Sequence, residues 1–196
     1  MNERRLPPTG TPHRAMSPND YILIYVNHID ISAPSGAGIN EREMIRALLR
    51  AYGSRVRYVG PSPRYDVGLP SDKMIIWPWR RSIFYQVVFE LWLMTTLFKL
   101  YLRYGRRMIL FVRPAPTSVA APLFSALFRV TLVTKFAGLP FRHVMRKAWI
   151  PLPIRWLMLS FLRWHARASK LMFVVTEPVG RSVQTRYGVP PERIVH

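Results

Sequence analysis

The feature that most constrains the fold is a strand-like run followed by a glycine-containing loop and an amphipathic helix. Residues 21–26 are apolar and rich in β-branched and aromatic side chains, which predicts a buried strand. Gly36 and Gly38 follow in the loop, and apolar residues then recur at helical spacing. Asn40 and Glu43 resemble a capping box at the helix start. This order is typical of a nucleotide-binding α/β unit.

The glycine loop has two interpretations. Gly36 and Gly38 would let the backbone approach a phosphate, which the free N–H groups of a helix start can bind. The alternative is a tight turn without a ligand. Glu41 and Glu43 favour the alternative, because they place negative charge where the phosphate would lie.

The remaining chain alternates strand-like and helix-like segments. Further strands are predicted at residues 56–59, 74–77, 108–112, 130–133, 171–175 and 193–195. Helices are predicted at residues 120–128, 154–169 and 179–187, and residues 141–153 are expected to be irregular. This alternation predicts an α/β fold, a Rossmann-like and mostly parallel sheet with helices on both faces.

Residues 83–104 are the most hydrophobic part of the chain. Their length matches that of a membrane-spanning helix. Gln86, Glu90 and Lys99 oppose this interpretation, because each is costly in the hydrocarbon core. We expect a long helix between the sheet and the surface, with a membrane span as the less favoured alternative.

The charge of the chain is strongly positive and unevenly placed. The 196 residues include 29 Lys and Arg but 10 Asp and Glu, and no acidic residue lies between Leu91 and Thr176. A domain with such a field attracts anions such as nucleic acid, acidic lipid or diphosphate groups, or a negative partner domain. A solvated basic face without a ligand is the plain alternative.

Cysteine is absent, which excludes disulfides and thiolate metal sites. No region combines histidine and acidic residues at metal-ligand spacing, so we expect no protein-held metal and no cofactor. Residues 1–20 form a basic, proline-containing segment that we expect to be a mobile arm without a secretory signal. Residues 21–196 are then the folded domain.

Candidate site residues follow the predicted strands, because ligands of open parallel sheets bind beyond the carboxyl ends of the strands. His28 and Asp30 follow the first strand, and either could be a general base for an acceptor hydroxyl. The alternative for Asp30 and its neighbours is turn formation. Arg113 and Lys135 follow two later strands and could clamp an acceptor phosphate, or could be ordinary surface cations.

A cluster of tryptophan and arginine residues lies in the second half of the chain. It could be a membrane-interface helix, or it could combine core packing with a basic solvent face. Its members are Trp149, Arg155, Trp156, Arg163 and Trp164.

The opening loop and the closing residues together resemble the amino-terminal half of a family 4 glycosyltransferase with the GT-B fold. The opening matches through the first strand, Gly36, Gly38 and the early Glu41. The closing run Tyr187-Gly-Val-Pro-Pro-Glu-Arg-Ile-Val195 matches the more specific motif, which follows a strand ending in Thr176 and a helix. Many members have a histidine after the strand matched by residues 130–133, whereas this chain has Thr134-Lys135-Phe136.

The resemblance implies hexosyl transfer from a nucleotide-sugar donor to an anionic or lipid-linked acceptor at the cytoplasmic face of a membrane, with peripheral membrane contact. Gly36 and Gly38 would border the donor phosphates. In the family a second, carboxyl-terminal domain supplies most of the donor site, so we expect this chain to be inactive alone and to partner such a domain. The alternative is a non-enzymatic basic α/β module that binds nucleic acid or acidic membranes, although no motif that reads RNA or DNA is present.

Overall fold

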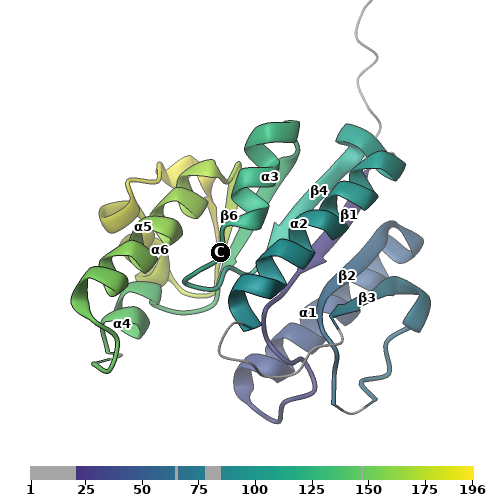
Figure 1. Cartoon of the computed structure of the whole chain (residues 1–196), viewed down its shortest axis with the longest axis horizontal. Coiled ribbons are helices and arrows are strands. Elements are labelled where there is room, and N and C mark those ends of the chain that lie inside the picture. The colour runs from purple at the N-terminus through teal and green to yellow at the C-terminus, as the bar shows by residue number, and fades with distance from the viewer. Residues whose placement is uncertain (1–20, 65, 78–84, 147) are drawn as a thin grey trace, which may run out of the picture.

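The architecture is one seven-stranded parallel sheet, shown by a computed structural model that describes residues 21–64, 66–77, 85–146 and 148–196 (Figure 1). The strand order is β3-β2-β1-β4-β5-β6-β7, and every neighbouring pair is parallel. The strands are β1 (Ile22–Val26), β2 (Val56–Pro61), β3 (Met74–Trp77), β4 (Met108–Val112), β5 (Thr131–Phe136), β6 (Leu171–Val174) and β7 (Ile194–Val195). The predicted Rossmann-like α/β class is confirmed.

Helices form most of the connections that parallel strands require. They are α1 (Gly36–Tyr52), α2 (Tyr85–Tyr104), α3 (Ala120–Phe128), α4 (Pro140–Met145), α5 (Leu152–Ala168) and α6 (Glu177–Tyr187). In Figure 1, α2 crosses in front of β1 and β4, and α3 lies beside it. On this side of the sheet, α2 packs on α3, α3 on α5, and α5 on both α4 and α6.

Alternation along β1 shows that both faces of the sheet are covered at its centre. Ile24 and Val26 point into a core shared with α2 and α3. Tyr25, between them, points to the opposite face and into a core built with α1. All three side chains are fully buried, which is why this strand is a continuous apolar run in the sequence.

Three local predictions need correction. The predicted capping box at Asn40 is wrong, because α1 already begins at Gly36 and the Ser35 side chain caps it by accepting a hydrogen bond from the Gly38 N–H. The expected irregular stretch 141–153 contains α4 and the first residues of α5. The strand predicted at 130–133 begins at Thr131 and continues to Phe136, so Lys135 lies within β5.

The long hydrophobic segment forms α2, whose buried side packs on the sheet through Phe89, Leu93 and Leu97. None of the helices in the described part of the chain has the length and apolarity that a bilayer crossing requires. Residues 83 and 84 of the predicted helix, and the expected arm at residues 1–20, lie outside the described residues.

Candidate functional site

The candidate site lies where the direction of chain progression reverses. From β1 the sheet continues to β2 and β3 on one side and to β4 through β7 on the other. At such a switch point the connections leave in opposite directions, which opens a crevice at the carboxyl ends of the strands. A cavity of about 490 Å³ lies here, and its walls include His28, Ala37, Arg113, Lys135 and Leu162.

A buried carboxylate lies behind the cationic residues that line this cavity. Glu41 of α1 has no exposed surface. Its Oε1 accepts from Arg113 Nη1 at 2.7 Å and from Lys135 Nζ at 2.8 Å, and its Oε2 accepts from the Tyr25 hydroxyl. The carboxylate is tolerated in the interior because both oxygens are hydrogen-bonded and two cations face it.

The fold brings these groups together from four separate elements. Arg113 directly follows β4, and its N–H donates to the carbonyl of Val26 at the end of β1. Lys135 is the penultimate residue of β5. Alternation sends Lys135 and Tyr25 to the sheet face that α1 covers, where Glu41 lies.

The Tyr25 hydroxyl serves this cluster as a donor. Burial raises the pKa of Tyr25 well above its usual value, and the negative charge of Glu41 raises it further. The phenol therefore remains protonated and donates to the carboxylate. Two cations then face one carboxylate, so the described cluster carries a net positive charge beside the cavity.

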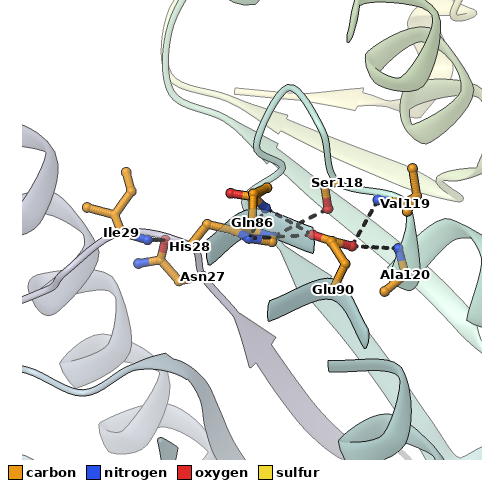
Figure 2. A network of polar contacts seen from close by, with 8 residues as sticks. All are labelled: Asn27, His28, Ile29, Gln86, Glu90, Ser118, Val119 and Ala120. Carbon is orange, nitrogen blue, oxygen red and sulfur yellow. Dashed lines mark hydrogen bonds and ion pairs between the residues drawn. The ribbon is translucent and has the colours of Figure 1, made fainter. Parts of the chain in front are cut away.

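A second polar network includes the cavity-lining residues His28 and Gln86 (Figure 2). His28 Nδ1 lies 3.1 Å from Gln86 Nε2, and His28 Nε2 lies 3.3 Å from Ser118 Oγ. An amide nitrogen can only donate, so Nδ1 accepts and the ring proton resides on Nε2, which donates to Ser118. Burial, with a smaller contribution from His165, lowers the pKa of His28 to about 3. The imidazole is therefore neutral at physiological pH.

Glu90 joins this network to the start of α3. Its Oε2 accepts from the backbone N–H groups of Val119 and Ala120 at 3.0 and 2.7 Å, and its Oε1 accepts from Gln86 Nε2 at 3.2 Å. A carboxylate at a helix start satisfies N–H groups that would otherwise be unpaired. Burial raises the pKa of Glu90, although these hydrogen bonds act in the other direction.

The predicted residues thus fall into different positions. Arg113, Lys135 and His28 meet at one cavity, as the strand-end rule suggested. Asp30 instead forms a turn: its Oδ1 accepts from the Ser32 backbone N–H at 2.9 Å, and its Oδ2 pairs with Arg64 at 3.2 Å. This geometry matches the turn interpretation of Asp30, while the catalytic roles of His28 and Asp30 remain predictions.

The two glycines that were predicted to lie in a loop are both in the first turn of α1, and they differ in what surrounds them. A Cβ at Gly38 would collide with the backbone carbonyl oxygen of Ala33, so the loop closes against the helix only with glycine there. A Cβ at Gly36 would meet no atom within 4 Å. Ala37, between them, lines the cavity. The start of α1 therefore borders the cavity, and donor-phosphate binding by the glycines stays a prediction.

Sequence reasoning did not find Glu41 and Tyr25 as site residues. Glu41 lies four residues before Ile45, on the side of α1 that becomes buried. A carboxylate at a buried helical position needs cationic partners, so its presence indicates that such partners lie nearby in the fold. The helical spacing of Glu41 could be read from the sequence. Its cationic partners could not, because they come from strands far along the chain.

Comparisons with known proteins place the fold. No protein-family model matches the chain, and no curated protein matches it. Among solved structures, UDP-GlcNAc 2-epimerase from Neisseria meningitidis bound to UDP-GlcNAc aligns with a TM-score of 0.59 and 11% identity, covering 89% of this chain. HepE from Anabaena in complex with UDP and glucose aligns with a TM-score of 0.55 and 10% identity, also covering 89%.

This chain spans 44% of the length of the epimerase and 43% of that of HepE. The likeness supports the fold, a Rossmann-like sheet of the kind that forms one half of a GT-B architecture. A closer relationship to family 4 glycosyltransferases is not shown by these structures. In the part of the chain that the structure describes, no group of three or more His, Asp or Glu side chains could hold a metal ion.

Proposed function

We propose that this chain is the acceptor-binding half of a sugar-nucleotide-dependent glycosyltransferase, and that its cavity holds an anionic group of the acceptor. The observation that carries the proposal is the pair Arg113 and Lys135 at the switch-point cavity, with the single carboxylate of Glu41 between them. One positive charge is left uncompensated in a partly buried site.

An entering anion would meet favourable chemistry there. Hydrogen bonds between a guanidinium or ammonium group and a phosphate are stronger than neutral ones. They gain further strength in the low dielectric of a buried site. Glu41 holds both cationic groups in place before the ligand arrives, so little side-chain freedom would be lost on binding. A phosphate or diphosphate of a lipid-linked acceptor fits this site.

The donor would contact the same cavity from the side of the glycine loop. The two structural neighbours were solved with UDP or a UDP-sugar, which supports a nucleotide-sugar donor here. Gly36 and Gly38 would border its phosphates, and a second domain would supply the remaining contacts. His28 lies in the cavity wall as a neutral imidazole and is our candidate for contact with the acceptor hydroxyl, with Asp30 as the weaker candidate.

Epimerisation of a UDP-sugar is the second candidate, because one of the two neighbours described above is a UDP-GlcNAc 2-epimerase. A non-enzymatic basic module that binds nucleic acid or acidic membranes is the third. The first two differ in their products, since transfer consumes an acceptor and epimerisation does not. In either case we expect no turnover of nucleotide sugars by this chain without a donor-binding domain.

The proposal is tested by titrating the chain with farnesyl phosphate and, as the matched neutral ligand, farnesol, using calorimetry. We expect the phosphate to bind at least about tenfold more tightly, as a charge-assisted contact implies. Lys135→Gln should remove about tenfold of that preference, whereas Lys170→Gln, an exposed lysine just before β6, should leave it unchanged. Equal affinity for both ligands, or equal effects of both variants, would contradict an anion site at Lys135.

A further inference from the structure

The outer side of α5 exposes an unusual amount of aromatic surface. We define the α5 face as Trp149, Trp156, Leu157, Arg163 and Trp164. The exposed fractions of its four apolar members are 80% for Trp149, 54% for Trp156, 53% for Leu157 and 37% for Trp164. Grouped apolar residues of this size on a surface mark an interaction site more often than scattered single ones do.

Helical spacing places these side chains together. Trp156 and Arg163 are seven residues apart, and so are Leu157 and Trp164, so each pair lies on one side of the helix. The opposite side of α5 is buried through Met158 and Leu162. The helix is therefore fixed to the core by one side and presents tryptophan, leucine and arginine on the other.

Arg155 fixes the loop that carries Trp149. Its Nε donates to the carbonyl of Ile150 at 2.8 Å, and its Nη1 donates to the carbonyl of Met145 at 3.0 Å. These contacts tie the end of α4 to the start of α5. Arg155 is thus a structural member of the sequence cluster, and it fixes the backbone that carries Trp149 just before the start of α5.

The charge around the α5 face has one sign. Arg142 of α4, a helix that packs on α5, and Arg146, which directly follows α4, are exposed, and the chain has no acidic residue between Leu91 and Thr176. On the neighbouring helix α6, the carboxylate of Glu177 is paired with Arg181 at 3.7 Å. A surface of this kind repels other basic surfaces and attracts anionic ones.

We propose that the α5 face binds the surface of a bilayer that contains anionic lipid. Tryptophan is favoured at the boundary between headgroups and acyl chains, and arginine beside it binds lipid phosphates. Leu162 of the same helix lines the switch-point cavity. Because Leu162 is on the buried side of α5, docking through the exposed side would hold the cavity about 10 Å, one helix diameter, from the headgroups of a lipid-linked acceptor. The bilayer contact does not depend on the proposed glycosyl transfer, and the two can fail separately.

The test is flotation of the full chain with vesicles of phosphatidylcholine alone and with vesicles containing phosphatidylglycerol. We expect binding to the anionic vesicles, weakened about tenfold or more in Trp156→Ser/Leu157→Ser because apolar burial is lost. Arg163→Gln should weaken it about fivefold, the value of one arginine near an anionic surface. Matched controls are Arg50→Gln and Tyr52→Ser, which change exposed residues of α1 on the other face of the sheet.

Circular dichroism first establishes that each variant is folded. The proposal is overturned if wild-type chain binds neither vesicle, or if the α1 variants lose as much binding as the α5 variants. Tight, salt-sensitive binding to RNA without any vesicle binding would also overturn it, in favour of a nucleic-acid surface. Farnesyl phosphate binding is read out separately, so failure of the bilayer contact leaves the cavity assignment standing.

Discussion

At the scale of single residues, Glu41 determines the charge of the candidate site. It is fully buried, and its two oxygens hold Arg113, Lys135 and Tyr25. Without it, two cationic groups would face each other in a partly buried place. The same contacts that pre-arrange the site for an anion therefore also stabilise the fold.

We predict that Glu41→Gln lowers the free energy of unfolding by about 3 kcal/mol, because removing one partner of a buried ion pair leaves uncompensated charge. Glu43→Gln is the matched control. Its carboxylate pairs with Arg46 at the surface, and such pairs contribute about 0.5 kcal/mol. Urea denaturation measures both values, and similar losses in the two variants would show that Glu41 is not a central partner.

The strand-end rule predicts that Arg113 and Lys135 lie close together, because side chains at the carboxyl ends of parallel strands converge. The structure brings both to one partner, Glu41, while their role in binding an acceptor stays a prediction. The rule could not separate Asp30 from them. Asp30 also follows a strand, but local hydrogen bonds to Ser32 turn it into a loop-forming residue. The position of a residue after a strand predicts that it lies near the site. Whether its side chain can bind a ligand depends on whether local hydrogen bonds already occupy it.

At the scale of elements, the start of α1 shows how a helix is positioned by its loop. Ser35 caps the helix, and Gly38 packs against the carbonyl of Ala33. The sequence places Asn40 and Glu43 at capping-box spacing one turn later. That signal is misleading, because the helix already begins one turn earlier. Ser35 caps it there, and Gly38 permits the close approach to Ala33.

We predict that Gly38→Ala lowers the free energy of unfolding by about 2 kcal/mol, since a methyl group there forces the loop away from the helix. Gly36→Ala should be neutral or stabilising by about 0.5 kcal/mol, because the added methyl group meets open space and alanine favours the helix. Thermal and urea unfolding of the two variants measure the difference. Equal destabilisation would mean that the close approach at Ala33 is not what requires glycine.

For the other elements, the sequence predicted whether each is a helix or a strand better than it predicted where each begins and ends. The β-branched and aromatic runs identified each of the seven strands in the described residues, because short apolar segments of this composition favour strands. Residues 141–145 lacked a clear periodicity, and α4 is a six-residue helix that depends on packing against α5. Short helices are marginal without tertiary contacts. For this reason α4 was missed while α2, α5 and α6 were found.

At the scale of the whole molecule, two buried histidines link stability to pH. Burial, with a smaller contribution from His165, lowers the pKa of His28 to about 3, and burial lowers the pKa of His165 to about 4, from an ordinary value of 6.5. As the pH falls below 6.5, these two histidines become protonated in the unfolded chain but stay neutral in the folded chain. The stabilising contribution is therefore complete above pH 6.5 and is lost progressively toward pH 4 for His165 and pH 3 for His28.

We predict that the free energy of unfolding falls with decreasing pH below 6.5, by about 1.4 kcal/mol per pH unit for each histidine. His165→Gln and His28→Gln should each reduce this slope. Glu90 acts in the opposite direction, because its pKa is raised on folding, so the difference between each variant and the wild type is the informative quantity. Urea titrations at pH 7, 6 and 5 provide it. An unchanged slope in both variants would contradict neutral burial of these histidines.

The strand order has a consequence for how the chain is assembled during its synthesis. The central pair of the sheet joins Leu23 to Ile109, whereas β1 meets β2 much sooner along the chain. Until β4 has left the ribosome, β1 must present an unpaired edge that invites pairing with other nascent chains. Translation that pauses before residue 112 should therefore expose this molecule to misassembly, and completion of β4 is the step that closes the centre of the sheet.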